Sequence, residues 1–189
     1  MAKTIVAFSG TPRIGGNSEI LADHILAGAA ETGATVERIR LHDMTISPCI
    51  ACGACAKSDE PKCVIDDDAG PLIKKLFDAD AFVLASPIYF FTVCAQLKAF
   101  MDRWYVLFSR GPIEVLKGKH MAAALTYGDK DPLTSGVVNA VGTFRDNCRL
   151  LRMNFVGCVH AACVDKGEVA TNETAIQKAR ELGKKLAEA

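Results

Sequence analysis

Short apolar blocks alternate along this chain with longer stretches in which apolar residues recur at helical spacing. The short blocks lack the polar alternation of a strand with one face in water, and they are typical of strands buried on both faces. They occupy residues 3–9, 36–41, 81–86, 120–127 and 155–164. The helical patterns occupy residues 19–30, 72–77, 93–108, 137–151 and 171–189. The pattern therefore predicts five strands alternating with five helices.

Alternation of this kind with short connections predicts parallel strands joined by right-handed crossovers. We therefore expect one α/β domain over residues 1–189, folded as a doubly wound three-layer sandwich. Five strands fit the flavodoxin-like order 2-1-3-4-5 better than the six-stranded dinucleotide-binding sheet. Residues 47–65 then form a cysteine-rich insertion after the second strand.

Composition gives no reason to expect a highly charged partner. The chain has 189 residues, of which 50% are hydrophobic, and its formal net charge is zero at pH 7. We expect no nucleic-acid partner and no binding to an anionic membrane. No apolar run approaches the ~18 residues of a membrane span, and the first run is too short for a signal peptide, so we expect a cytoplasmic location. Disulfides are rare there, so eight cysteines indicate metal binding, redox chemistry or burial.

The loop after the first strand, residues 9–18, has the composition of an anion site. Its glycines let backbone N–H groups approach a ligand, and the following helix N-terminus adds positive potential. Gly10 and Gly15 have the spacing of an ATP-binding P-loop, but Gly16 and Asn17 stand where that motif needs Lys and Ser or Thr. No G-x-G-x-x-G follows the strand, which disfavours a dinucleotide. A terminal phosphomonoester fits, and a plain turn rich in Gly and Pro is the alternative.

Four of the eight cysteines lie in one turn-rich segment with the spacing C-x2-C-x2-C-x7-C. They are Cys49, Cys52, Cys55 and Cys63. Thiolates this close repel one another unless a metal neutralises them, and three ligands at a period of three suit an iron–sulfur cubane. Structural zinc usually takes two separated C-x2-C pairs or adds histidine, and no second pair lies in this sequence. A four-iron cluster, a zinc ion and an empty site in a cluster-less reductase are the three interpretations.

Three segments carry a resemblance to a known family. Residues 9–13, Ser-Gly-Thr-Pro-Arg, followed by Gly-Asn-Ser, resemble the phosphate loop of the NADPH-dependent FMN reductases, a branch of the flavodoxin-like proteins. Residues 86–91, Ser-Pro-Ile-Tyr-Phe-Phe, are similar to the flavin-ring segment of the same branch. With the cysteine segment after the second strand, the whole chain resembles the iron–sulfur flavoproteins, which pair FMN with a four-iron–four-sulfur (4Fe-4S) cluster.

The resemblance implies an FMN site and a cluster site on particular residues. Carried over by position, the FMN phosphate would be held by Ser9, Thr11, Arg13, Asn17 and Ser18. The ribityl chain and ring edge would lie along Pro87, Ile88, Tyr89 and Phe90, for whose aromatic rings core packing is the alternative. The pocket would be closed by Thr126, Tyr127, Gly128 and Asp129. The 4Fe-4S cluster would be held by Cys49, Cys52, Cys55 and Cys63.

The function implied by the resemblance is electron transfer, through FMN and the cluster, between a carrier such as ferredoxin and a small-molecule acceptor. No side chain is expected to act as a catalytic acid or base, because the cofactors carry the chemistry. One alternative is an NAD(P)H-dependent FMN or quinone reductase without a functional cluster, and another is a flavin- or zinc-binding regulatory module. The family also implies a homodimer or homotetramer. An interface would suit the apolar helix that carries Phe100, Met101, Trp104, Tyr105 and Phe108.

Two further expectations concern distance and reactivity. In the order 2-1-3-4-5 the cysteine segment and the flavin segment leave the same sheet edge two strand spacings apart, roughly 10 Å. The family resemblance also allows the relevant flavin to belong to a neighbouring subunit. Cys94 opens a helix, where a lowered thiol pKa is one possibility. The remaining cysteines are expected to be small apolar residues of the interior, namely Cys148, Cys158 and Cys163.

Overall fold

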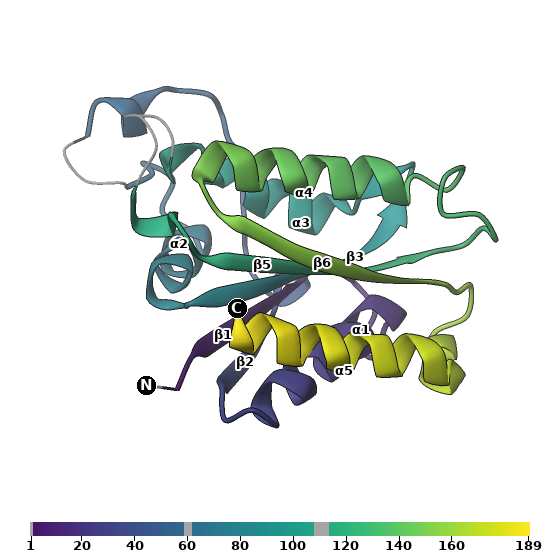
Figure 1. Cartoon of the computed structure of the whole chain (residues 1–189). Helices are drawn as coiled ribbons and strands as arrows, with labels where there is room; N and C mark the ends of the chain where they lie inside the picture. Colours follow the sequence, from purple (N-terminus) through teal and green to yellow (C-terminus); the bar gives the residue numbers. More distant parts are fainter. Residues whose placement is uncertain (1, 59–61, 108–113) are drawn as a thin grey trace.

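The computed structural model describes residues 2–58, 62–107 and 114–189. Its centre is a parallel sheet in the order β2-β1-β3-β5-β6 (Figure 1). The five strands are β1 (Thr4–Ser9), β2 (Thr35–Arg40), β3 (Ala81–Tyr89), β5 (His120–Tyr127) and β6 (Asn154–Ala162). Numbered as parallel strands alone, this order is 2-1-3-4-5, so the expected flavodoxin-like sandwich is confirmed.

The third parallel strand continues into a hairpin that the apolar pattern did not reveal. β3 extends to Tyr89, and β4 (Thr92–Val93) pairs with its end in the antiparallel sense. The expected strand end at residue 86 and helix start at residue 93 are therefore wrong. The turn between the two strands holds Phe90 and Phe91 at φ values of 45° and 66°. Such two-residue turns need left-handed backbone at both positions, which Asn and Gly usually supply.

The start of α4 (Val137–Leu151) holds this turn in place. Asn139 Nδ2 donates a hydrogen bond to the Phe91 carbonyl oxygen at 3.1 Å. Gly136 provides the room, because a Cβ at that position would stand 2.4 Å from Phe91 Cα. The hairpin is thus fixed by a helix that lies far from it in the sequence.

Helices cover both faces of the sheet (Figure 1). On one face lie α1 (Asn17–Ala30) and α5 (Glu173–Glu188); on the other lie α2 (Ala69–Asp78), α3 (Ala95–Asp102) and α4. Short 3-10 helices complete the structure: η1 (Leu41–Asp43), η2 (Ala54–Ala56), η3 (Arg103–Leu107), η4 (Glu114–Leu116) and η5 (Glu168–Thr171). The predicted helix over residues 93–108 is thus an α-helix of eight residues that tightens into η3. Within the described ranges, no helix has the length and apolar character needed to cross a membrane.

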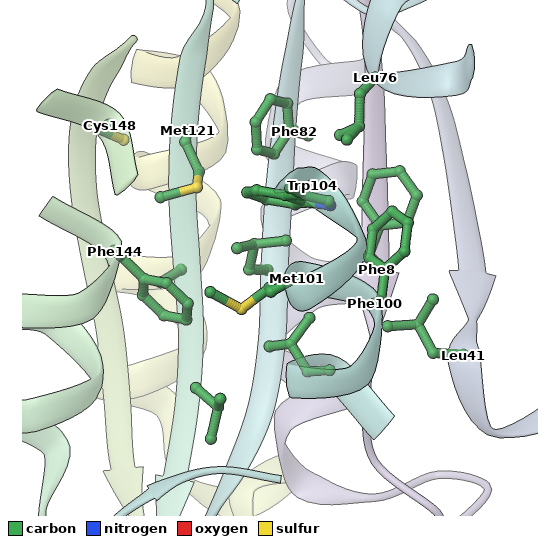
Figure 2. Packing of buried hydrophobic residues seen from close by; sticks show 14 of the residues in the cluster. Phe8, Leu41, Leu76, Phe82, Phe100, Met101, Trp104, Met121, Phe144 and Cys148 are labelled. Atoms are coloured by element: carbon green, nitrogen blue, oxygen red, sulfur yellow. The ribbon is translucent and has the colours of Figure 1, made fainter. Parts of the chain in front are cut away.

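Aromatic rings fill the layer between the sheet and α3 (Figure 2). Phe8, Phe82, Phe100 and Trp104 contact one another with ring centroids 5.0 to 6.5 Å apart, mostly edge to face. Phe100 and Trp104 are buried, as is Met101. The reason offered for an interface on this helix is therefore wrong for these three residues, because their side chains form the core of the chain itself, whereas Tyr105 is 49% exposed. Phe108 lies outside the described residues, and the homodimer or homotetramer stays a prediction.

The helices α1 and α5 lie unusually close together. A Cβ on Gly28 would stand 2.0 Å from the Arg180 carbonyl oxygen, and a Cβ on Gly183 would stand 1.9 Å from the Ile25 carbonyl oxygen. A larger residue at either glycine would push the two helices apart. The first and last helices of the structure are therefore fitted to each other backbone against backbone.

Candidate functional site

A cavity of about 260 Å³ lies at the carboxyl ends of β1, β3, β5 and β6. Open parallel sheets covered by helices bind ligands at this edge. Nine of the residues predicted to bind FMN belong to its lining: Thr11, Arg13, Asn17, Pro87, Ile88, Tyr89, Thr126, Tyr127 and Gly128. The structure therefore brings together the first loop, the end of β3 and the end of β5.

The other four predicted residues lie around the cavity and not in its lining. Ser9 and Ser18 are buried beneath the first loop. Phe90 is 96% exposed at the tip of the hairpin. Asp129 lies on the surface, where its carboxylate accepts hydrogen bonds from the Lys130 N–H and the Thr134 hydroxyl. Direct contact of these four residues with FMN stays a prediction.

Small residues shape the loop between β1 and α1. A Cβ on Gly16 would stand 2.7 Å from Thr11 Oγ1 and 3.0 Å from the Arg13 carbonyl oxygen. Thr11 Oγ1 in turn accepts a hydrogen bond from the Arg13 N–H at 3.3 Å. The buried hydroxyl oxygens of Ser9 and Ser18 have no hydrogen-bond partner within the described residues. Unpaired buried hydroxyls are costly, and a glycine-lined loop at a helix N-terminus suits an anion, so these residues fit a phosphate.

A buried carboxylate braces this loop from the side of α1. Glu19 is 2% exposed, and its Oε1 accepts a hydrogen bond from the Gly15 N–H at 3.1 Å. Its Oε2 pairs with Arg40, and Arg38 Nη1 lies 3.4 Å from Oε1. The hydrogen bond to Asp43, together with the nearby Glu19 carboxylate, raises the pKa of Arg40 above its ordinary value. No sequence pattern pointed to Glu19, since an acid in the first turn of a helix is common.

The segment after β6 also lines the cavity, and no sequence prediction included it. Cys163 and Val164 belong to the lining. Asn17 ties this segment to the first loop, because its Nδ2 donates to the Asp165 carbonyl at 2.8 Å and its Oδ1 accepts from the Val169 N–H at 3.2 Å. The rule that ligands bind at the carboxyl ends of strands could have found this segment, because the fifth parallel strand ends immediately before it.

The four cysteines of the predicted metal site lie on the loop between η1 and α2, which η2 interrupts. All four are free thiols; Cys49 and Cys52 are exposed, and Cys55 and Cys63 are half-buried. In the part of the chain that the structure describes, no group of three or more Cys, His, Asp or Glu side chains is arranged to hold a metal ion. A hollow of about 470 Å³ adjoins Cys63 and is also lined by Ala54. Four thiols are the donor chemistry that an iron–sulfur cluster requires. Of the four, only Cys63 lines this hollow, and the described residues do not gather the four thiols around a common point.

The cysteine loop lies away from the cavity. In Figure 1 the loop, drawn in blue, is at the opposite end of the sheet from the β3–β4 hairpin. The expected proximity of the cysteine loop to the flavin segment therefore does not hold within one chain. The strand spacing itself is as expected, but after η1 the chain runs along α3 and leaves the carboxyl edge of the sheet.

The cysteines outside this loop are poor nucleophiles. Cys94 is 1% exposed, and its thiol donates to the Gly10 carbonyl oxygen at 3.1 Å. Burial raises the pKa of Cys94 above its ordinary value, which overturns the lowered pKa considered from its place at a helix start. Burial also raises the pKa of both Cys148 and Cys158 to about 12. In Cys163, burial and the nearby Glu168 raise the pKa to about 11.

Alkylation of the metal-free protein should follow this order. We expect iodoacetamide to label Cys49 and Cys52 first, because they are exposed, and Cys94 and Cys148 last, because the thiolate is the reacting species. Peptide mass spectrometry over a time course measures the rates, and labelling in denaturant provides the reference for full access. Rapid labelling of Cys94 in the folded protein would contradict its burial under the first loop.

Comparisons with known proteins agree with these features. The model of the NADPH-dependent FMN reductase family matches residues 4–173. An iron–sulfur flavoprotein from Archaeoglobus fulgidus is 32% identical over 186 residues, which cover 97% of this chain and 79% of the relative. Another, from Methanocaldococcus jannaschii, is 43% identical over 99 residues, which cover 52% of this chain and only 50% of the relative's length. The solved structure of the Trp repressor binding protein from Bacillus subtilis has a TM-score of 0.70 at 24% identity, covers 95% of this chain and 98% of its own, and shows the fold alone.

Proposed function

The chain belongs to the NADPH-dependent FMN reductase family and, within it, to the iron–sulfur flavoproteins, and from this premise we propose that it is an FMN-dependent redox protein that carries a 4Fe-4S cluster. It is a flavin-dependent oxidoreductase. The proposed reaction passes electrons between a carrier such as ferredoxin and a small-molecule acceptor. The observation that carries the proposal is the meeting of the first loop, the β3 hairpin and the ends of β5 and β6 in one cavity.

The phosphate of FMN would lie in the loop between β1 and α1. Two cations flank that loop. Arg13 lines the cavity, and Lys166 Cε lies 3.7 Å from the position that a Cβ on Gly15 would take. The hydroxyls of Ser9 and Ser18 are unpaired within the described residues and are available as donors. Charge-assisted hydrogen bonds from a guanidinium suit a phosphomonoester, which supports FMN over riboflavin as the ligand.

The flavin ring would lie between residues 87–89 and residues 126–128, which line the cavity from two strand ends. Tyr127 is held in this wall, since its ring lies against His160 with a centroid distance of 5.8 Å. When bound, FMN supplies one- and two-electron chemistry. The residues of the chain would orient the ring, and backbone N–H groups at these strand ends would hydrogen-bond its polar edge.

The cluster would be held by Cys49, Cys52, Cys55 and Cys63. Four thiolate ligands are what a 4Fe-4S cluster requires. The cysteine loop lies at the opposite end of the sheet from the β3–β4 hairpin (Figure 1), and the end of β3 lines the cavity. The cluster of one copy would therefore serve the flavin of another. That arrangement fits the predicted homodimer or homotetramer.

An NAD(P)H-dependent FMN or quinone reductase without a functional cluster is the second candidate. The description of the matched family supports it, and so does the scatter of the four thiols over an open loop. A reduced nicotinamide would then be the electron donor.

Anaerobic purification followed by iron, sulfide and flavin assays tests the proposal. We expect about four iron and about four sulfide per chain, together with FMN. Less than about one iron per chain would overturn the cluster and leave the second candidate. Reduction of the bound flavin by ferredoxin, compared with NADH and NADPH, then identifies the class of donor. A flavin that none of them reduces would favour a regulatory module over an oxidoreductase that uses these donors.

A further inference from the structure

We propose that Arg103 is a positioning residue for the cluster: it closes the neck of the cysteine loop and so restrains the arm that carries Cys63. The neck consists of Ser47 on one arm and residues 65–67 on the other. This inference rests on the proposed function, because it takes Cys63 to be a cluster ligand.

Arg103 donates hydrogen bonds to both arms of the loop. Its Nη1 donates to the Ser47 carbonyl oxygen at 3.0 Å and to Asp67 Oδ2 at 2.7 Å. Its Nη2 donates to the Ile65 carbonyl oxygen at 3.2 Å. Cys63 lies two residues before Ile65, on the arm that this hydrogen bond holds. One arm precedes the first three cysteines and the other carries the fourth, so a single side chain joins both ends of the loop.

Asp67 completes the neck. Its Oδ2 also accepts a hydrogen bond from the Ser47 N–H at 2.9 Å, and its Oδ1 accepts one from the Ala69 N–H at 3.1 Å. Burial alone would raise the pKa of Asp67, but the hydrogen bonds from Arg103, Ser47 and Ala69 outweigh it and hold the pKa below its usual range. This carboxylate, which lies just before α2, therefore also fastens the opposite arm of the loop.

The burial of the pair shows that these contacts are not incidental surface contacts. The side chain of Arg103 is 0% exposed and that of Asp67 is 4% exposed. A buried charge persists only when it is paired and hydrogen-bonded. These hydrogen bonds from Arg103 go to the neck of the loop, to two backbone carbonyl oxygens and one carboxylate. A planar guanidinium can bridge three such acceptors, whereas an ammonium on a flexible stem cannot hold them in a fixed geometry.

The backbone of Arg103 is itself well fixed. It directly follows α3, and the neighbouring Phe100 and Trp104 are locked in the aromatic layer of the core (Figure 2). The other end of α3 lies beside the cavity, where the Cys94 N–H donates to Ser86 Oγ at 2.9 Å. Arg103 thus anchors a loop of little regular structure to one of the most rigid parts of the molecule.

Cobalt binding to the metal-free protein tests this role, because four thiolates give Co²⁺ a strong absorption that is independent of enzyme activity. We expect Arg103→Gln to weaken Co²⁺ binding about tenfold or more, as loss of a supporting group around a metal site commonly does. Arg103→Lys keeps the charge but not the planar guanidinium. It should bind Co²⁺ more tightly than Arg103→Gln and more weakly than the unsubstituted protein. After reconstitution with iron and sulfide, Arg103→Gln should shift the cluster midpoint potential to a more negative value and Arg103→Lys should not, because a nearby positive charge favours the added electron. FMN binding, measured by fluorescence, should stay unchanged in both variants.

Lys98→Gln is the matched control, since Lys98 lies on α3, the helix that Arg103 follows, in an exposed ion pair with Asp102 and should leave Co²⁺ binding unchanged. If both Arg103 variants lower Tm but bind Co²⁺ as tightly as the unsubstituted protein at a temperature where all are folded, Arg103 only stabilises the fold and the proposal is overturned. Should Arg103→Gln not fold, unchanged Co²⁺ binding by Arg103→Lys would overturn it equally. An unsubstituted protein that binds neither Co²⁺ nor an iron–sulfur cluster overturns the proposed function as well, which separates that failure from one confined to Arg103.

Discussion

Replacing Cys63 with serine should destroy or convert the four-iron cluster while FMN stays bound. A serine oxygen is a poorer ligand for iron than a thiolate, and a 4Fe-4S cluster needs all four cysteines. Cys63 belongs to the cysteine loop, and that loop lies at the opposite end of the sheet from the β3–β4 hairpin beside the cavity (Figure 1), so loss of Cys63 should not reach the flavin. We expect iron to fall from about four to about three or fewer per chain, with the flavin content unchanged. Iron, sulfide and flavin assays on anaerobically purified protein measure both quantities.

Cys148→Ala is the control for this change. Cys148 is a buried thiol on α4, outside the cysteine loop, so its substitution should leave both iron and FMN in place at a modest cost in stability. Joint loss of iron and FMN from Cys63→Ser, with Cys148→Ala intact, would show that the two sites are coupled within the fold and would contradict their separation.

Gly16→Ala should weaken FMN binding about 10- to 100-fold. The added methyl group would stand 2.7 Å from Thr11 Oγ1 and 3.0 Å from the Arg13 carbonyl oxygen, so the loop must open to accept it. Overpacking of a close-fitting site typically costs about 1–3 kcal/mol, which corresponds to that range in affinity. Thr11 and Arg13 both line the cavity, so the cost falls on the residues proposed to hold the phosphate. Titration of the apoprotein with FMN, followed by flavin fluorescence, measures the change.

Gly142→Ala is the matched substitution elsewhere. Gly142 lies within α4, and a Cβ there has no neighbouring atom within 4 Å among the described residues. It should leave FMN binding unchanged and stabilise the helix by up to about 1 kcal/mol. Equal FMN affinity for Gly16→Ala and the unsubstituted protein would mean that the first loop does not hold the phosphate.

The sheet and most of the cavity lining were predictable because they follow from local patterns and one topological rule. The strand His120–Tyr127 was placed with both ends correct, since its apolar centre, residues 121–125, lies in a short segment between Lys119 and Gly128. Once the strands are known to be parallel, the loops after β1, β3 and β5 must share an edge, whatever their sequences. That rule brought nine predicted residues to one cavity.

The features that the sequence concealed depend on contacts between distant segments. The hairpin turn is made by Phe90 and Phe91, although two-residue turns usually show Asn or Gly, so its aromatic residues looked like strand or core. Arg103 follows an apolar helix and could pass for a surface cation; only the path of the cysteine loop buries it. The same path takes the cysteine loop away from the flavin segment. Strand spacing could not predict this, because it says nothing about where a long loop goes after it leaves the sheet.

During synthesis, α1 has no partner on its outer side until residues 173–188 have been made. The glycines at the α1–α5 contact let these two helices pack backbone against backbone. The hydrogen bonds between Asn17 and residues Asp165 and Val169 likewise form only after those two residues have been made. Translation adds about 5–20 residues per second, so roughly 8–30 seconds separate the emergence of α1 from that of α5. Over that interval the apolar side of α1 is exposed to other nascent chains. The phosphate loop, although encoded near the beginning of the chain, is therefore among the last parts of the molecule to reach its final form.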